Sequence, residues 1–187
     1  MMLVSHASKI LNYYVYLKNT YLHHTYGNRE GRFPYVEQPK AYFLEPFEEA
    51  FANLWKSTVV QLAKDLNSDS LLYETMNDRV RHHLFCPSAK GGEHYRLTER
   101  GFQHWWKSFA GGFSLERSLS DAIHTLYYDV NQQKVGDRAV SLSIIYDDVE
   151  LSTVVRAPGF CVVSVKELLL KYDEVLARVI ASVRETS

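Results

Sequence analysis

The fold expected for this chain depends on residues 91 to 101, which read GGEHYRLTERG. The adjacent glycines Gly91 and Gly92 predict a tight polar turn, because glycine adopts backbone angles that other residues avoid. A short strand is expected over residues 93 to 97, and Thr98 is expected to cap the helix that follows it. The stretch therefore predicts a turn, a strand and a helix start in direct succession.

Two amphipathic patterns lie just upstream of this stretch. Apolar residues recur at helical spacing over residues 47 to 66 and again over residues 70 to 84. The polar triplet at residues 67 to 69 separates the two patterns. The predicted order of elements is helix, turn, helix, hairpin and helix.

In this order, residues 59 to 104 resemble the winged helix-turn-helix family. Residues 59 to 66 look like the first helix of the motif, and residues 70 to 84 occupy the place of its recognition helix. Residues 86 to 95 look like the wing, and residues 95 to 101 are similar to the strand-to-helix exit of bacterial regulators. The resemblance implies a small, non-enzymatic regulator that binds double-stranded DNA as a dimer.

The resemblance also implies which residues would contact DNA. A recognition helix enters the major groove, where Asn77 and Arg81 would read base edges. The other expected contacts are to phosphates, from Lys64, Lys90, His94 and Arg96. These six residues form the predicted DNA-binding site.

The rest of the chain predicts a mixed architecture. Residues 8 to 26 are expected to form a helix, and a second amphipathic helix is expected at about residues 115 to 127. The apolar period then changes to two, which predicts strands over residues 140 to 146, 149 to 155 and 160 to 163 with a hairpin turn at Asp147 and Asp148. Ser164 and Glu167 form a capping box that opens the last helix.

The expected fold class is therefore α+β. Its N-terminal two-thirds are helical with a winged-helix-like segment, and a C-terminal antiparallel β-meander and a closing helix follow. The expected parts are residues 1–46, an N-terminal helix and Pro-rich packed loop; residues 47–112, the winged-helix-like segment; and residues 113–187, which hold the sheet. These parts are expected to share one core.

Composition limits the class of function. The chain of 187 residues is 46% hydrophobic and has a formal net charge of −1, which excludes a strongly basic coat but leaves room for a local basic patch. Cys86 and Cys161 lie far apart, as expected of two ordinary thiols in a reduced cytoplasmic protein. No apolar run approaches the roughly 18 residues of a membrane span, and no cofactor-binding motif is present.

A protein-binding module, such as an immunity, antitoxin or phage-encoded interaction protein, is the main alternative. Tyrosine is enriched at protein interfaces, and seven tyrosines fall near the N-terminus. They are Tyr13, Tyr14, Tyr16, Tyr21, Tyr26, Tyr35 and Tyr42. The first three point in different directions on a helix, so they are not expected all to be core, and the seven would form a partner surface or pack under the Pro-rich loop. The apolar stripe of the C-terminal helix is the candidate seam of a homodimer.

Three weaker patterns point to other chemistry. The spacing of Arg117 and His124 resembles the Arg-to-His motif of the HEPN ribonucleases, which implies RNA cleavage. A histidine and cysteine set offers zinc-type ligands, although surface histidines and a buried thiol are the simpler expectation. That set is His82, His83, Cys86, His94 and His104. Asp147, Asp148 and Glu150 would suit a hard cation, but a hairpin turn explains them more simply, and no metal site is expected.

Overall fold

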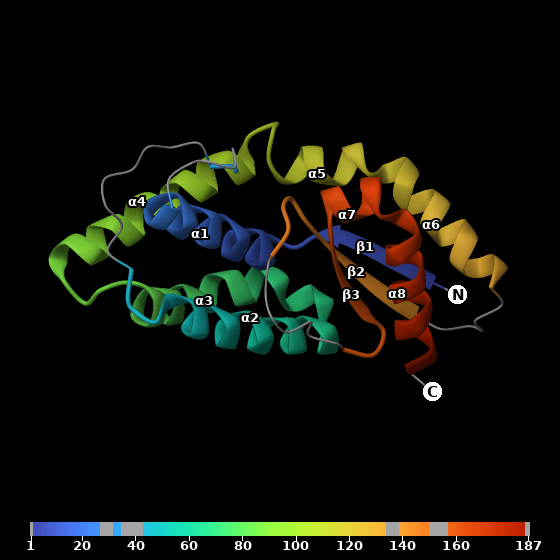
Figure 1. Ribbon diagram of the computed structural model, residues 1–187, viewed down its shortest axis with the longest axis horizontal. Coiled ribbons are helices and arrows are strands. Elements are labelled where there is room, and N and C mark those ends of the chain that lie inside the picture. The colour runs from blue at the N-terminus through green and yellow to red at the C-terminus, as the bar shows by residue number, and fades with distance from the viewer. Residues whose placement is uncertain (1, 27–31, 35–42, 134–138, 150–156, 186–187) are drawn as a thin grey trace.

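The computed structural model describes residues 2–26, 32–34, 43–133, 139–149 and 157–185. Most of these residues are helical, and three strands form one small sheet (Figure 1). The strands are β1 (Met2–Ala7), β2 (Ala139–Ile145) and β3 (Phe160–Ser164). The helices are α1 (Lys9–Tyr26), α2 (Phe47–Lys64), η1 (Leu66–Ser68, a 3-10 helix), α3 (Asp69–Leu84), α4 (Ala89–Lys107), α5 (Gly112–Ser118), α6 (Ser120–Gln132), α7 (Val165–Leu170) and α8 (Tyr172–Glu185).

The sheet is parallel throughout, in the order β1-β2-β3. Leu3 lies opposite Val140 in the first pair, and Leu142 lies opposite Cys161 in the second. The predicted α+β fold with an antiparallel meander is therefore wrong: the protein is mostly helical with a small all-parallel sheet. Parallel strands need long crossovers, and α1 to α6 supply the one between β1 and β2.

The strand β1 accounts for much of this error. It comes first in the chain, was not expected from the sequence, and provides the partner for one edge of β2. The predicted strands over residues 140 to 146 and 160 to 163 do form, as β2 and β3, but they run in the same direction. Most of the strand expected over residues 149 to 155 lies outside the described residues.

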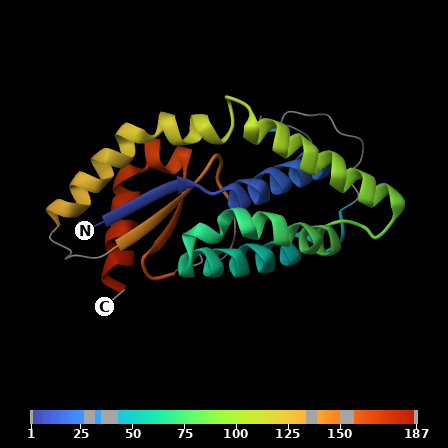
Figure 2. The same ribbon diagram turned by 180° about the vertical axis from the view of Figure 1, so that it is seen from behind.

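The described residues form two apolar cores. One core lies among α1 to α4, which we call the helical lobe, and the other lies among the strands, α6, α7 and α8. We call the strands with α5 to α8 the sheet lobe. The helical lobe extends beyond the carboxyl ends of the strands, as both views show (Figures 1 and 2). The predicted division of the chain at residues 46 and 112 stays a prediction.

The apolar face of α8 packs inside the sheet lobe. Val175, Val179 and Val183 are buried, and α8 contacts β2, β3 and α6. This face was the predicted seam of a homodimer, and it is covered by elements of the same chain. None of the described helices is both long enough and apolar enough to cross a membrane.

The helix α1 lies at the centre of the helical lobe. It contacts α2, α3 and α4, and every residue from 11 to 20 is buried. Tyr13, Tyr14 and Tyr16 are at most 2% exposed, so the expectation that they would not all be core is wrong. A helix covered on all sides buries side chains in every direction, which removes these three from any partner surface. Of the other four, Tyr21 is half-buried, Tyr26 ends α1, and Tyr35 and Tyr42 lie outside the described residues.

The stretch that determined the expected fold is one continuous helix. Residues 93 to 97 lie inside α4, and Ser88 caps this helix by accepting a hydrogen bond from the Gly91 backbone nitrogen at 3.0 Å. The predicted strand, and the wing tip at Gly91 and Gly92, are therefore wrong. Thr98 is no cap either, because it is buried in the middle of α4 and its hydroxyl donates to the His94 carbonyl.

Gly91 allows close packing of the backbone instead of the predicted turn. A β-carbon at this position would lie 2.1 Å from the carbonyl oxygen of Cys86. The glycine therefore allows the start of α4 to approach the preceding segment closely, which is a second common reason for glycine besides a turn.

Candidate nucleic-acid interface

The six predicted DNA-contacting residues do not form one surface. Arg81, Lys90 and Arg96 are exposed, whereas His94 is 4% exposed and lies with its ring near Phe43 and Phe85. Burial lowers the pKa of His94, which keeps its imidazole neutral. His94 therefore contacts no phosphate.

The other two predicted residues are also displaced from a DNA-reading position. Asn77 is half-buried in α3, with Oδ1 enclosed by protein. Lys64 is exposed, but it ends α2 beside the turn into α3, at the opposite end of α3 from Arg81. Only Arg81, Lys90 and Arg96 remain together, near the first turns of α4.

An exposed row of cations runs along α4 from this point. A β-carbon at Gly92 would lie 3.5 Å from Arg81 Nη2, which places the Arg81 guanidinium over the first turn of α4. Arg96 and Arg100 follow on successive turns of one exposed face, and Lys107 lies two turns beyond Arg100 on the same face. We call Arg81, Arg96, Arg100 and Lys107 the cationic row.

The charges of this row are not neutralised by ion pairs. Within the described part of the chain, no carboxylate lies within ion-pair distance of any of its four members. Glu99, on a neighbouring turn, accepts a hydrogen bond from Gln103 Nε2 at 2.7 Å. Burial lowers the pKa of Lys9, and the nearby Lys107 charge lowers it further, which indicates two cations close together at this end of the row.

Two exposed aromatic rings stand where the row ends. Phe109 is 80% exposed and Phe113 is 54% exposed, and their ring centroids lie 5.4 Å apart. The Arg117 guanidinium carbon lies 5.9 Å from the Phe113 ring centroid. We call Phe109 and Phe113 the aromatic tip. The turn that carries it is the uppermost part of the molecule in both views (Figures 1 and 2).

Glycines in the turn between α4 and α5 explain why the rings project. Gly111 and Gly112 are buried against the preceding helix, and a β-carbon at Gly111 would lie 2.2 Å from the Trp105 carbonyl oxygen. A β-carbon at Gly112 would lie 2.9 Å from the Trp106 ring. The backbone can therefore press against α4 only here, and the flanking phenylalanines are directed outward.

The predicted ribonuclease pair lies on two helices instead of one. Arg117 belongs to α5 and His124 to α6, and the chain breaks helical geometry at the fully buried Leu119 between them. Both side chains are exposed, and Arg117 contacts Phe113. The six-residue spacing was informative only if both residues shared one helix.

The predicted zinc ligands are dispersed. His82 Nδ1 lies 2.6 Å from the Asp78 carbonyl oxygen on its own helix, and the Cys86 thiol donates to the Phe43 carbonyl. His94 is buried and His104 is exposed on α4. Among the described residues, no three histidine, cysteine or acidic side chains are grouped as metal ligands.

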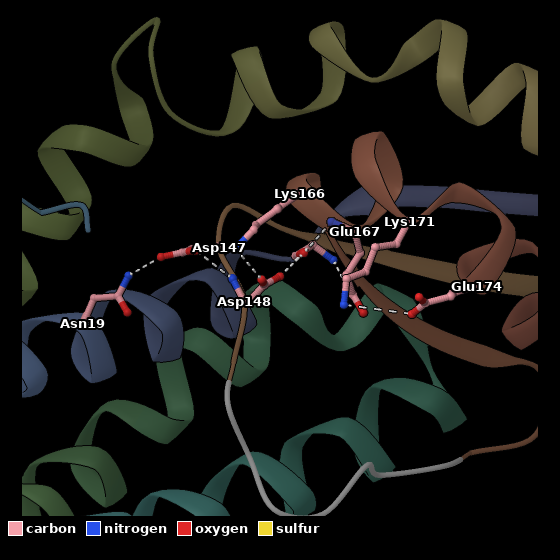
Figure 3. A network of polar contacts seen from close by, with 8 residues as sticks. Asn19, Asp147, Asp148, Lys166, Glu167, Lys171 and Glu174 are labelled. Atoms are coloured by element: carbon pink, nitrogen blue, oxygen red, sulfur yellow. Dashed lines mark hydrogen bonds and ion pairs between the residues drawn. The ribbon is translucent and has the colours of Figure 1, made fainter. Parts of the chain in front are cut away.

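The carboxyl ends of the strands hold another polar cluster (Figure 3). Asn19 Nδ2 donates to Asp147 Oδ2 at 2.9 Å. Asp148 accepts a hydrogen bond from the Ser164 hydroxyl, and its Oδ2 lies 3.5 Å from Lys166 Nζ. Ligands of open parallel sheets bind at this edge, but here the side chains bond to one another across the two lobes.

This cluster replaces the predicted hairpin turn and cation site. Asp147 and Asp148 follow a strand that pairs in parallel with β3; Asp147 bonds Asn19 of the helical lobe, whereas Asp148 bonds Ser164 and Lys166 within the sheet lobe. Glu150, the third predicted ligand, lies outside the described residues. The capping box of Ser164 and Glu167 is confirmed, but the helix that it opens, α7, ends at Leu170, and the last helix is the separate α8.

Comparisons with protein-family models, with curated proteins and with solved structures found no match for this chain. The function must therefore be inferred from the side chains described above. Sequence reasoning identified Arg81 and Arg96 but missed Arg100, Lys107 and the aromatic tip. Their spacing along residues 96 to 107 is visible in the sequence once this segment is recognised as one helix.

Proposed function

We propose that this protein is a non-enzymatic nucleic-acid-binding protein that holds a single strand along α4. The observation that carries the proposal is a row of exposed cations that form no ion pair with any residue the structure describes, and that ends at two exposed aromatic rings. Proteins that bind single strands combine a positive track for the phosphates with aromatic rings on which bases stack. The net charge of −1 favours such a local track over general attraction to polyanions.

A single strand fits this surface better than a duplex. Stacking on Phe109 or Phe113 needs a base that is free of its own stack, which a single strand supplies. The helix α3 carries Glu74 and Asp78 on its exposed face, and carboxylates repel phosphates. Because residues 86 to 95 form no wing, double-stranded DNA is not proposed as the ligand.

The length of the cationic row limits how many phosphates it can contact, and therefore the expected affinity. Residues 96 to 107 span roughly 16 Å of helix, enough for a few phosphates. Binding of this kind without base readout has dissociation constants of about 10⁻⁴ to 10⁻⁶ M at physiological salt. We expect an affinity in that range, tightening as salt is lowered.

Fluorescence anisotropy with labelled oligonucleotides tests the proposal. The single strand is expected to bind more tightly than a duplex of the same sequence, and Arg96→Gln combined with Arg100→Gln is expected to weaken binding severalfold. Lys56→Gln, an exposed cation on α2, is the matched control and is expected to bind like the parent. Equal affinities for the double variant and the parent would reject the proposal.

A protein partner is the second candidate, because an exposed aromatic pair also suits a protein hot spot. This candidate is tested by capture from a nuclease-treated lysate. It is favoured if the parent captures a protein that can be identified, and if the Phe109→Ser variant no longer captures that protein. Ribonuclease activity is not proposed, since Arg117 and His124 lie on separate helices.

We propose the cytoplasm as the site of action. Cys86 and Cys161 are both free thiols, and a reducing compartment keeps them so. Burial raises the pKa of Cys161, which makes its thiol a poor nucleophile and suits a structural role.

A further inference from the structure

The helices α2 and α3, which follow one another in the chain, line an open groove. The two helices lie side by side in both views (Figures 1 and 2). The groove has a volume of about 500 Å³, and Pro46, Ala50 and Leu54 provide its apolar lining. This volume falls in the range of small-molecule sites, roughly 300 to 1,000 Å³.

Polar side chains of opposite charge flank the apolar lining. Glu49 and Asn53 come from neighbouring turns of α2, and Arg79 and His83 come from neighbouring turns of α3. All four are exposed, and within the described residues Glu49 and Arg79 form no ion pair. The hydrogen bond that Arg79 makes there is a weak one, from Nη1 to the Met76 sulfur at 3.7 Å.

The distribution of charge limits the class of ligand. A simple anion would be attracted by Arg79 but repelled by Glu49. A simple cation would be attracted by Glu49 but repelled by Arg79. A molecule that carries both charges satisfies both side chains at once, and an apolar body would cover Pro46 and Ala50. Charge-assisted hydrogen bonds are the stronger kind, so two of them would give both affinity and orientation.

We propose that the α2–α3 groove binds a small zwitterion with an apolar body, a free amino acid or a short peptide. The ligand carboxylate lies on the Arg79 guanidinium with His83 as a second donor. The ligand ammonium lies on the Glu49 carboxylate, and the Asn53 amide oxygen accepts from it. The apolar side chain of the ligand packs on Pro46 and Ala50.

This site is separate from the proposed nucleic-acid interface. Arg79 faces α2, whereas Arg81, two residues further on, lies over Gly92 of α4. Residues two apart on a helix do not share a face. A substitution in the groove is therefore expected to leave nucleic-acid binding unchanged, so the two proposals can fail independently.

Titration of the full chain with four probes, followed by NMR chemical shifts, tests the groove. Leucine and leucyl-leucine both carry an ammonium and a carboxylate, and comparing them distinguishes a free amino acid from a short peptide as the ligand. N-acetyl-leucine lacks the ammonium and leucinamide lacks the carboxylate, so both are expected to bind at least tenfold more weakly than leucine. Tighter binding of leucyl-leucine would support the proposal and identify a peptide as the ligand.

Two variants test which side chain binds each charged group of the ligand. Arg79→Gln and Glu49→Gln are each expected to weaken binding of the better zwitterion at least tenfold, with an unchanged melting temperature. Arg81→Gln and Glu48→Gln are the matched controls, because they remove exposed charges from the same helices outside the groove. The proposal is overturned if neither zwitterion binds at millimolar concentration, if a singly charged probe binds equally well, or if the groove variants bind like the parent.

Discussion

Asn12, fully buried in α1, donates a hydrogen bond from Nδ2 to the carbonyl oxygen of Ile144 at 2.8 Å. Its Oδ1 accepts from the Tyr146 backbone nitrogen, also at 2.8 Å. One side chain therefore satisfies a backbone acceptor and a backbone donor where β2 ends, and it fixes the helical lobe to the sheet lobe. Buried backbone groups need such partners, because leaving one unpaired costs about 1–3 kcal/mol.

Asn12→Ala is expected to lower the free energy of unfolding by about 2–5 kcal/mol, because it removes the partner of the Ile144 carbonyl and of the Tyr146 backbone nitrogen. Urea denaturation followed by circular dichroism measures the change. Asn67→Ala, at an exposed position of η1, is the control and is expected to have little effect. A small effect of Asn12→Ala would mean that the lobes are not joined in this way.

The adjacent glycines of α4 are expected to respond in opposite directions to alanine. Gly91→Ala places a β-carbon 2.1 Å from the Cys86 carbonyl oxygen and is expected to cost about 1–3 kcal/mol of stability. Gly92→Ala meets only the flexible Arg81 guanidinium at 3.5 Å, so the helix propensity of alanine is expected to add about 0.5–1 kcal/mol.

Melting temperatures of the two single variants check this expectation. The contrast is specific to a continuous α4, because a glycine pair at a hairpin tip would gain no helix stability from either alanine. Destabilisation by Gly92→Ala as large as that by Gly91→Ala would contradict the helical assignment.

Stability is expected to fall as the pH drops below about 6.5, the ordinary pKa of histidine. Burial is the main cause that lowers the pKa of His6 and of His94, and the Asp69 and Glu116 charges partly oppose it at His6. Between about pH 6.5 and the lowered pKa values of the folded protein, these two histidines are therefore protonated in the unfolded chain but neutral in the folded protein.

Urea denaturation at pH 7 and at about pH 5.5 measures this loss. His94→Gln is expected to show a smaller loss between the two pH values than the parent, because it removes a buried imidazole. Identical pH dependence in the His94 variant and the parent would show that burial of His94 does not control its protonation.

Local signals in the sequence predicted three of the long helices correctly. The expected helices at residues 8 to 26, 47 to 66 and 70 to 84 agree with α1, α2 and α3 to within about two residues at each end. Their apolar stripes face a shared core, and such stripes repeat at a period that no strand imitates. The capping box at Ser164 likewise marks the start of α7, because it depends on only four consecutive residues.

The direction and pairing of the strands could not be predicted from the sequence. A period of two is the same for parallel and antiparallel strands, and nothing local in residues 2 to 7 shows that they pair with residues 139 to 144. The buried run from Leu142 to Ile145 is typical of a parallel strand covered on both faces. The segment had been interpreted as alternating, which favoured a hairpin.

The candidate site was missed for a related reason. Interpreting Gly91 and Gly92 as a turn divided α4 and hid the regular spacing of Arg96, Arg100 and Lys107. The helix α4 ends at Lys107, and the Phe109 ring beyond it is exposed. Close contacts of Gly91, Gly111 and Gly112 with residues five or six positions earlier determined both results, and the residue pattern alone does not show which glycines allow a turn and which allow close packing.

The salt dependence of single-strand binding tests the central claim most directly. For a single strand, the logarithm of the affinity falls with the logarithm of salt concentration by about 0.7 per phosphate contact. The triple variant of Arg96, Arg100 and Lys107 to glutamine is therefore expected to reduce this slope by about 2, with the fold unchanged by circular dichroism. A slope equal to that of the parent would contradict the assignment of phosphate contacts to the exposed face of α4.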